Sequence, residues 1–545
     1  IGRWYSDTEV FHVGGLVWVE VRGERWAMVG LDPAAGTEAR RVDFPETYPK
    51  TRGHHRCHPN KATTRYFLLD TNGIDFIDWQ TPKIYDVRPI RGSCYYGILP
   101  ANGLVYVPPN ACQCGEYLRG FVAFSPSKVT TPEAGASVRF ERGPAFGKTP
   151  VGSDTADPDA WPMHRHDPQR SGSTSAVVSA ELKPLWERKI GGRLTAPTVA
   201  GGTVFLSRPD THEVCAFDAV TGEPRWRRTT DGRVDSPPTI HGGLVLFGCR
   251  NGWVTCLRAG DGEMVWRFRA APGERRISAF GQLESPWPVS GSVLVHQGTA
   301  FFSAGHFSEL DGGITVYAAD PASGKILWEK KPAGIMDEIM AGKVWETSYP
   351  PVALNDVLTA SGEFVSMRSL GFDVKTGEMT PSRYGLWTRS GMLDPGSWAG
   401  RMRWRGPSLH AELLVFNRRQ TCGFIIKPST EWPAIPGKGE YALFARPSWK
   451  ETTWTSPVSL RARAMVLAAD TLFVAGVPDV VDEKEYWARI EGLKGTELWV
   501  VSAVDGKKLH VLQLDAVPVF DGMAAAGGRL YLTTTDGRLL CFGQE

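Results

Sequence analysis

The sequence lacks an excess of either charge and has no long hydrophobic runs. Its 545 residues hold 61 Lys and Arg against 59 Asp and Glu, so the formal net charge is +2, and no block of five like charges occurs. Nucleic acids and anionic membranes recruit proteins through clustered basic residues, so we expect neither as a partner. No stretch approaches 18 consecutive apolar residues, which excludes a membrane-spanning helix.

The motifs of several enzyme classes are also missing. There is no G-x-S-x-G, no Walker loop, no G-x-G-x-x-G after a strand and no H-E-x-x-H. These motifs place nucleophiles, phosphate-binding amides or zinc ligands, so the mechanisms that depend on them have no support. The chain starts at Ile1 rather than Met, and we expect a mature or trimmed product whose targeting signal is not visible.

Cysteine is sparse and odd in number. Nine cysteines cannot pair completely, and they are too few to staple a small disulfide-rich domain. Five cysteines lie inside apolar, strand-like runs, where we expect buried, unreactive thiols: Cys215, Cys249, Cys256, Cys422 and Cys541. The other four lie before residue 115.

Turn formers and tryptophan are abundant instead. The chain has 60 Gly, 39 Pro and 20 Trp. Turn residues together with aromatics favour many short strands joined by tight turns over long helices. We therefore expect an all-β fold.

A repeated turn signature runs along the chain. In FDAVTGEPRW, Asp218 is followed by Gly222 and Trp226. The spacing predicts a strand end, a turn capped by Asp or Ser, a Gly with positive φ, and a returning strand that places its aromatic over the neighbouring unit. Clear copies follow at Arg258/Gly262/Trp266 and Asp320/Gly324/Trp328, and weaker ones at Asp32/Gly36, Asp373/Gly377 and Ser502/Gly506/His510.

A second element precedes each signature: a run ending in Gly-Gly or Asn-Gly and then a β-rich strand, as in TAPTVAGGTVFLSR. Together the two elements predict about four strands per unit, which is typical of the antiparallel blades of a β-propeller. We expect one propeller over residues 1–545, with eight blades and a range of seven to ten, closed by its termini so that no sheet edge stays open. Residues 128–182 are turn-rich and polar and are predicted to be a long irregular insertion before a returning strand at LKPLWERKI.

The repeat units and the segment WPMHRHDPQRSG, from Trp161 to Gly172, resemble the quinoprotein-like (PQQ-like) β-propeller repeat superfamily. The stretch that begins at DSPPTIHGG is similar to large secreted propeller proteins of planctomycete-type bacteria. The resemblance is strong over residues 160–335 and weak at both ends. It implies a β-propeller in the periplasm or outside the cell, and it implies structural roles for His164 and His166.

The same resemblance leaves the activity open, because the superfamily includes alcohol and glucose dehydrogenases and also non-catalytic assembly lipoproteins. Its quinone-dependent members place adjacent cysteines against the cofactor and Glu, Asn and Asp around a calcium ion. This sequence has no Cys-Cys pair, and its nearest approach is Cys112-Gln113-Cys114. That departure argues against PQQ as the cofactor.

The densest polar cluster is GHHRCHPNKAT, which holds His54, His55, Arg56, Cys57, His58 and Lys61. Imidazole suits Zn, Cu or Fe, so one reading is a metal site on His54, His55 and His58, and another is a loop of solvated histidines. Calcium stays an alternative metal. Four nearby cysteines are candidates for disulfides or a soft-metal site, with no pairing assigned: Cys57, Cys94, Cys112 and Cys114.

Aromatic and charged residues near the predicted inner rim suggest a polysaccharide ligand in the central funnel. Sugars bind to aromatic faces with charged groups at their hydroxyls. The predicted binding residues are Lys61, Asp235, Glu284, Trp287, His306 and Asp311. For elimination on an acidic glycan, Arg56, Arg91 or a metal would neutralise the carboxylate, and Tyr96 or His55 would take the proton. The alternatives are a PQQ-dependent oxidoreductase and a non-catalytic scaffold for protein interactions.

Overall fold

The computed structural model describes residues 9–21, 26–45, 59–70, 74–87, 92, 96–108, 121–126, 138–148, 159–279, 281–308, 310–332, 355–368, 370–382, 385–388, 402–405, 411–427, 440–447, 452–478, 488 and 491–544. The prediction of an all-β fold is confirmed, because these residues form short antiparallel sheets and their only named helix is a 3-10 turn at Pro209–Thr211. The chain divides into two compact units. Unit 1 comprises residues 1–130, 307–313 and 332–354, and unit 2 comprises residues 131–306, 314–331 and 355–545.

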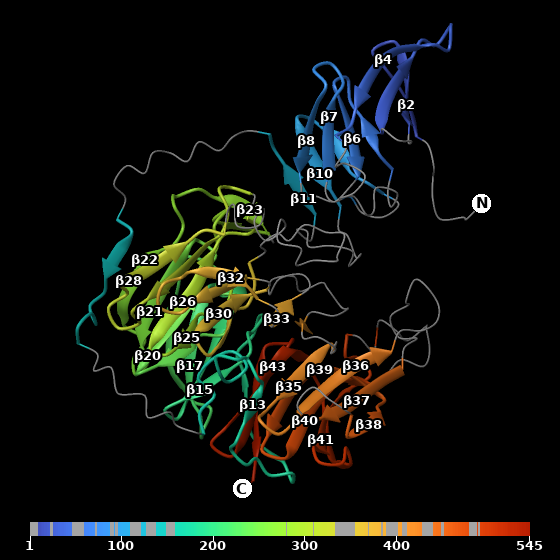
Figure 1. The fold of residues 1–545 in the computed structure, drawn as a ribbon. Coiled ribbons are helices and arrows are strands. Elements are labelled where there is room, and N and C mark those ends of the chain that lie inside the picture. Colours follow the sequence, from blue (N-terminus) through green and yellow to red (C-terminus); the bar gives the residue numbers. More distant parts are fainter. Residues whose placement is uncertain are drawn as a thin grey trace. The chain divides into compact units, whose positions relative to one another are not determined.

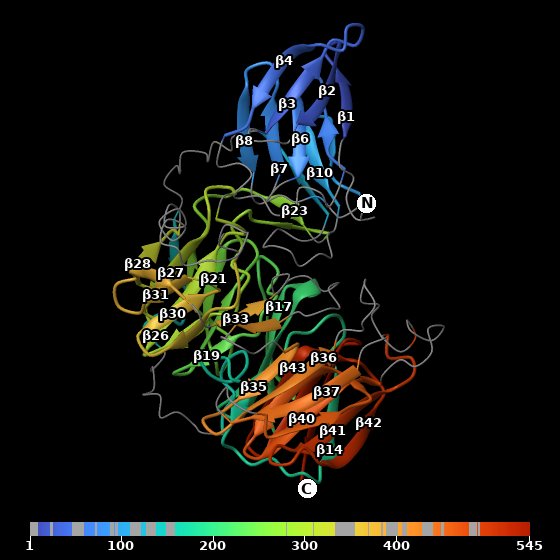
Figure 2. The same ribbon diagram turned by 45° about the vertical axis from the view of Figure 1, so that its right-hand side comes forward.

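Unit 1 contains two four-stranded sheets and one three-stranded sheet among its described residues, drawn in blue in Figure 2. Trp18, Phe67 and Trp79 lie in the core between the first two sheets. The strands are β1 (Val10–Val13), β2 (Leu16–Val21), β3 (Ala27–Leu31), β4 (Glu38–Asp43), β5 (Lys61–Ala62), β6 (Tyr66–Asp70), β7 (Ile74–Asp78), β8 (Lys83–Val87), β9 (Leu99–Ala101), β10 (Leu104–Val107) and β11 (Val122–Phe124).

Unit 2 contains seven sheets of four or five strands among its described residues. Four strands that follow each other in sequence build most of these sheets, which pass from green to red in Figure 1. The sheets are β15 (Thr198–Ala200) to β18 (Pro224–Thr229) with β16 (Thr203–Arg208) and β17 (Glu213–Asp218); β19 (Thr239–His241), β20 (Leu244–Gly248), β21 (Trp253–Arg258) and β22 (Met264–Arg269); β25 (Leu294–His296), β26 (Thr299–Ala304), β27 (Thr315–Ala319) and β28 (Ile326–Lys330); β29 (Thr359–Ser361), β30 (Phe364–Met367), β31 (Leu370–Asp373) and β32 (Met379–Pro381); β35 (Leu413–Phe416), β36 (Thr421–Lys427), β37 (Glu440–Arg446) and β38 (Trp454–Pro457); β39 (Leu460–Ala468), β40 (Thr471–Pro478), β41 (Thr496–Ser502) and β42 (Lys508–Leu514); and β43 (Pro518–Ala526), β44 (Arg529–Thr534) and β45 (Arg538–Gly543).

The last sheet takes its fourth strand from much earlier in the chain. Strand β14 (Lys183–Lys189) pairs antiparallel with β45. This is the strand expected at LKPLWERKI, and it lies inside the chain rather than at its N-terminal end. First strands of neighbouring sheets adjoin in the order β43, β15, β19, β25, β29 and in the order β35, β39, β43, as in a propeller. The blade number and the single domain over residues 1–545 stay predictions.

The predicted insertion also contributes strands. Within residues 128–182, β12 (Phe140–Arg142) adds a fifth strand to the β19–β22 sheet, and β13 (Ser173–Thr174) pairs in parallel with β39. Two further hairpins belong to unit 2: β23 (Ile277–Ala279) with β24 (Gln282–Glu284), and β33 (Gly385–Thr388) with β34 (Met402–Arg405).

The turn signature packs each sheet onto the next. Asp218 Oδ1 accepts hydrogen bonds from the amides of Val220 and Thr221, which confirms the capped turn. Trp226 lies against Gly262 of the following sheet, and its Nε1 donates to the carbonyl of Ala259 at 2.8 Å. The predicted placement of the aromatic over the neighbouring unit is therefore confirmed.

The same contact recurs along unit 2. A Cβ atom added to the glycine would lie 2.6–2.8 Å from the tryptophan ring of the preceding sheet in each pair. Only glycine therefore fits beneath the ring. The pairs are Trp186–Gly222, Trp226–Gly262, Trp266–Gly324, Trp328–Gly377 and Trp454–Gly506.

Candidate functional site

Residues 159–174, here called the central segment, bond to the first strands of the unit 2 sheets. Trp161 exchanges two hydrogen bonds with Val199 of β15, at 2.7 and 2.8 Å. In further backbone bonds, amides from the sheets donate to carbonyls of the segment: Ile240 to Pro162, Ala360 to Pro168, Phe416 to Ser171, Leu467 to Gly172 and Gly527 to Asp159. With the bond from Arg170 to Ser292 O beside β25, one short stretch reaches all seven sheets.

Two buried arginines hold the central segment in place. Arg170 is fully buried and donates to the carbonyls of Leu358 at 3.0 Å, His164 at 2.9 Å and Ser292 at 3.3 Å. Burial lowers its pKa to about 9, the charge of Arg165 acts in the same direction, and Asp167 opposes both. A buried guanidinium needs such acceptors, because an unsatisfied buried charge is costly.

Arg165 and His164 meet a carboxylate from β43. Arg165 Nη1 donates to Asp521 Oδ1 at 2.8 Å, and His164 Nε2 lies 3.7 Å from Asp521 Oδ2. Burial and the charges of Arg170 and Arg165 hold the pKa of His164 well below its usual range. Burial raises the pKa of Asp521, although Arg165 opposes the shift. His164 is therefore a neutral, structural histidine.

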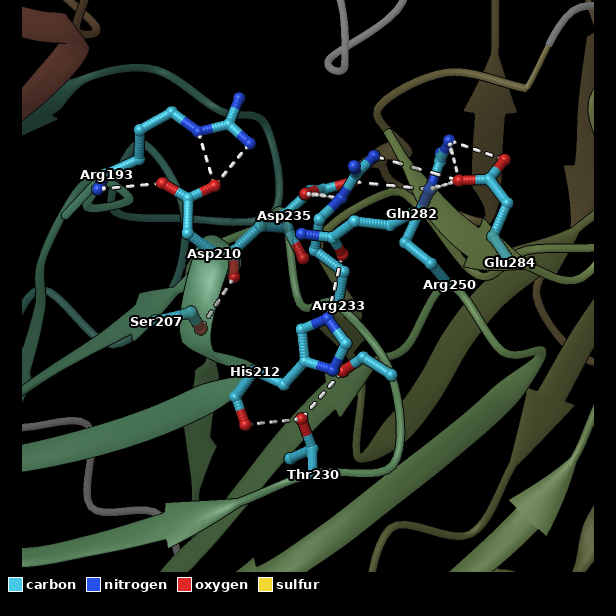
Figure 3. Close-up of polar contacts among 12 residues, drawn as sticks. Arg193, Ser207, Asp210, His212, Thr230, Arg233, Asp235, Arg250, Gln282 and Glu284 are labelled. Atoms are coloured by element: carbon cyan, nitrogen blue, oxygen red, sulfur yellow. Dashed lines mark hydrogen bonds and ion pairs between the residues drawn. The ribbon is translucent and has the colours of Figure 1, made fainter. Parts of the chain in front are cut away.

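A second group of charged residues, the loop network, consists of Arg233, Asp235, Arg250, Glu284 and His306 (Figure 3 shows all but His306). Arg250 binds Glu284 through two hydrogen bonds, of 2.7 and 2.8 Å. Arg233 Nε lies 2.7 Å from Asp235 Oδ1, and His306 Nε2 lies 3.2 Å from Glu284 Oε1. Burial favours a raised pKa for Glu284, but His306 and Arg250 outweigh it and lower the pKa.

The members of this network lie at or beyond the ends of strands. Arg233 and Asp235 precede β19, Arg250 follows β20, Glu284 ends β24 and His306 follows β26. Related ion pairs join the loop before a first strand to the loop after a second strand: Arg193 to Asp210 at 2.5 Å and Arg368 to Asp356 at 2.6 Å. Next to the network, His212 Nε2 bonds to Gln282 Oε1 at 2.8 Å (Figure 3).

The network balances its own charges. Two arginines face two carboxylates, and the side chains of Arg250 and Glu284 are 1% and 2% exposed. His306 is more open, at 25%, but its Nε2 is engaged by Glu284. The arrangement can fix the positions of loops, and it holds no cation that lacks a carboxylate beside it.

The structure brings together three of the predicted binding residues, Asp235, Glu284 and His306. Trp287 is buried and 3% exposed. Asp311 belongs to unit 1, where it takes a positive φ of 51°. Lys61 is half-buried at the start of β5, and Tyr96 is 77% exposed. These assignments stay predictions.

The remaining predicted site residues lie outside the described residues, and so do the metal and disulfide assignments that rest on them: His54, His55, Arg56, Cys57, His58, Arg91, Cys94, Cys112 and Cys114. In the part of the chain that the structure describes, no three His, Cys, Asp or Glu side chains gather to hold a metal ion. The five cysteines of the apolar runs are buried and free, which confirms their predicted burial, and their low reactivity stays a prediction.

The sequence did not predict the roles of the arginines in the central segment and in the loop network. Arg165 and Arg170 lie in the segment that was read as a structural lead-in, and Arg233 and Arg250 lie in loops between strands. The position of an arginine after a strand could have indicated the network. Arg368 directly follows β30, and one residue separates Arg250 from the end of β20.

Comparison with known proteins agrees with the repeat. The PQQ_2 family model, described as outer membrane protein assembly factor BamB, matches residues 170–389. Those residues are PQQ-like propeller repeats. BamB of Burkholderia pseudomallei is 25% identical over 242 residues, or 38% of this chain and 60% of that protein. BamB of Yersinia pestis is 24% identical over 185 residues, or 32% and 44%. The chain thus spans about half the length of these relatives.

The solved structures that match include a dehydrogenase and BamB. The quinohemoprotein alcohol dehydrogenase ADHIIG of Pseudomonas putida HK5 has a TM-score of 0.48 at 13% identity, covering 72% of this chain and 82% of that one. BamB of Moraxella catarrhalis has a TM-score of 0.32 at 14% identity, covering 67% and 98%. Among the described residues of the PQQ-like chain, no helix has the length and hydropathy needed to cross a membrane.

Proposed function

We propose that this PQQ-like-repeat propeller is a non-catalytic platform that binds other proteins of the cell envelope. The observation that carries the proposal is the central segment. Small ligands of ring-shaped folds bind where the inner elements converge. Here the chain's own residues 159–174 bond to the first strands of six unit 2 sheets and, at Ser292, to the residues just before the first strand of the seventh. The arginines of this segment are already supplied with acceptors.

The loop network supports the same reading. A catalytic site needs a charge or a proton acceptor that is available to the substrate. Arg250 and Glu284 are buried against each other, and His306 is bound to the same carboxylate. Buried ion networks of this kind contribute positional specificity more than stability.

The residues described around the first strands do not fit PQQ, the cofactor for which the repeat is named. PQQ carries three carboxylates, so its site must offer several cations. Arg165 is bonded to Asp521 and to the carbonyl of Arg170, while Arg170 is bonded to three carbonyls. We derive no reaction step through a quinone.

The relatives supply the class of partner. The curated proteins that match residues of this chain carry the name outer membrane protein assembly factor. By that likeness we propose a periplasmic location and envelope proteins as partners. The crosslinking experiment described next identifies these partner proteins.

The test is crosslinking in intact host cells, with the full chain carrying a photoreactive residue at Val220, which is 58% exposed on unit 2. We expect a defined adduct with one or a few envelope proteins, identified by mass spectrometry. The same residue at the buried position Val245 is the matched control and should give no adduct.

Two activity assays complete the test. In the first assay, purified chain is mixed with PQQ, calcium, an alcohol or aldose as the electron donor, and an electron-accepting dye. In the second, it is mixed with acidic glycans while unsaturated products are followed by ultraviolet absorbance. We expect neither dye reduction nor unsaturated products. Turnover in the first assay would establish an oxidoreductase, and turnover in the second would establish the glycan-cleaving reading; either would overturn the platform.

A further inference from the structure

The turn between β9 and β10 in unit 1 consists of an asparagine followed by a glycine. Asn102 and Gly103 have φ values of 52° and 72°, and the strands on either side pair directly at Ala101 and Leu104. Two left-handed residues between paired strands form the hairpin turn for which Asn-Gly is a preferred sequence. Both turn residues are exposed, and nothing lies within 4 Å of the Cβ position of Gly103. The glycine therefore stands clear of packed side chains.

The amide of Gly103 is available as a nucleophile. Among the described residues, neither this amide nor the side chain of Asn102 has a hydrogen-bond partner. Asparagine is a thermolabile residue, because the amide nitrogen of the next residue can attack its side-chain carbon Cγ. Glycine has no side chain to hinder that approach. The attack needs a rotation of the peptide between the two residues, and no contact of the turn with other side chains opposes it.

A second Asn-Gly pair, at Asn251 and Gly252, is held by hydrogen bonds. The amide of Gly252 donates to the carbonyl of Cys249 at 3.1 Å, and Asn251 Oδ1 accepts a 3.2 Å bond from the amide of Trp253. The carbonyl of Gly252 accepts two more amides, at 2.9 and 3.1 Å, and the residue is buried. The nucleophile of this pair is therefore engaged, and its peptide cannot rotate without breaking these bonds.

From this contrast we propose that Asn102 is a site of spontaneous deamidation in the folded chain and that Asn251 is protected from it. A bond forms between the nitrogen of Gly103 and Cγ of Asn102, the bond from Cγ to the side-chain nitrogen breaks, and ammonia leaves. Water then opens the resulting succinimide at either carbonyl group and yields aspartate or isoaspartate. No oxidant or reductant is needed. The third Asn-Gly pair of the sequence, residues 72–73, lies outside the described residues.

The modification acts on the β9–β11 sheet. Both products place a negative charge at the tip of the hairpin. Isoaspartate also routes the main chain through the former side chain, which adds a backbone atom to a turn that joins Ala101 directly to its partner Leu104. Because the reaction is slow and irreversible, the pairing of β9 with β10 should weaken with the age of the molecule. The proposal goes beyond the platform function and does not depend on it.

The test incubates the full chain in mildly alkaline buffer, folded in one sample and unfolded in guanidinium chloride in another. Both samples are then digested, and the products at each position are measured by peptide mass spectrometry. In the folded chain, position 102 should react roughly 30-fold faster than position 251, because two hydrogen bonds must break before Gly252 can attack. In denaturant those bonds are absent, so the two positions should react at similar rates.

Two glutamine variants provide matched controls. Asn102→Gln has a longer side chain that would have to close a larger and less favoured ring, so product at position 102 should fall below detection. Asn251→Gln should leave the rate at position 102 unchanged. A third variant, Asn102→Asp, carries the new charge on a normal backbone. Hydrogen exchange in β9 and β10 should become faster in aged wild type and stay slow in this variant, since only isoaspartate lengthens the backbone.

Equal rates at the two positions of the folded chain would overturn the proposal, and so would a position 102 that does not react while the chain is folded. Unchanged hydrogen exchange in an aged chain that contains isoaspartate would overturn the predicted effect on the β9–β11 sheet. None of these results bears on crosslinking at Val220 in unit 2, so this proposal and the platform function can fail separately.

Discussion

The contact between tryptophan and glycine across neighbouring sheets predicts a large and position-specific cost for a single methyl group. Gly262 has a φ of +70°, and an added Cβ would lie 2.7 Å from Cε3 of Trp226. Gly298, in the turn between β25 and β26, has a nearly equal φ of +73° and nothing within 4 Å of its Cβ position. Alanine at the two sites therefore separates backbone strain from the clash.

The magnitudes follow from these two terms. A left-handed conformation costs an L-residue about 1–2 kcal/mol, and we expect that loss of unfolding free energy for Gly298→Ala. Overpacking of a fitted site costs about 1–3 kcal/mol more, so Gly262→Ala should lose roughly 2–5 kcal/mol. In a Trp226→Ala background the ring is gone and only the contact with Cγ of the Arg228 side chain, at 2.9 Å, remains, so most of the extra cost of Gly262→Ala should disappear.

Urea unfolding followed by far-ultraviolet circular dichroism measures these differences in all four variants. Trp226→Ala alone should also be destabilising, because it removes the bond to the Ala259 carbonyl. Equal losses for Gly262→Ala and Gly298→Ala would refute the packing argument. An extra cost of Gly262→Ala that is undiminished without the Trp226 ring would refute it as well.

Three other measurements test the structure. The pKa of His164 is depressed in the folded state, so below about pH 6.5 the unfolded state alone binds the proton. The free energy of unfolding should therefore fall by up to about 1.4 kcal/mol for each pH unit below about pH 6.5. His164→Gln should flatten the urea-midpoint profile between about pH 7 and pH 5, whereas His510→Gln, on an exposed position of β42, should not; an unchanged slope would contradict a neutral His164. Asp521, whose raised pKa acts with the opposite sign, is present in both proteins. Burial raises the pKa of Cys249 to about 12, so iodoacetamide should label this thiol only in concentrated urea, and rapid native labelling would show that it is exposed. Burial favours a raised pKa for Asp78, but its hydrogen bonds outweigh this and lower the pKa to about 2, so its stabilisation is present above about pH 4 and is lost as the pH falls towards 2; Asp78→Asn should remove that loss from acid titrations of stability.

The repeat made most of the fold predictable. The spacing of Asp218, Gly222 and Trp226 encodes a capped turn and a returning aromatic through local chemistry, and the structure has both. The strand that completes the last sheet was harder to place. Its partner β45 lies some 350 residues away, and strand pairing over that separation leaves no local pattern.

The arrangement of charges could not be predicted for a related reason. Arg250 meets Glu284 because the loops of consecutive sheets converge, and Arg170 meets three carbonyls from different parts of the chain. From the sequence alone, a single arginine in a loop is predicted to be exposed to solvent. The resemblance implied a structural role for the segment around His164. Its contacts with the seven four- and five-stranded sheets of unit 2 depend on the closure of the ring.

The pairing of β14 with β45 has a consequence for biosynthesis. The last sheet of unit 2 needs residues 183–189 and residues 538–543 at once, so it cannot form until synthesis has reached residue 543. Contacts of such sequence separation form late and leave earlier sheets with open edges in the meantime. The edges of the earlier sheets should therefore need protection from unwanted strand pairing until residues 538–543 have been synthesised.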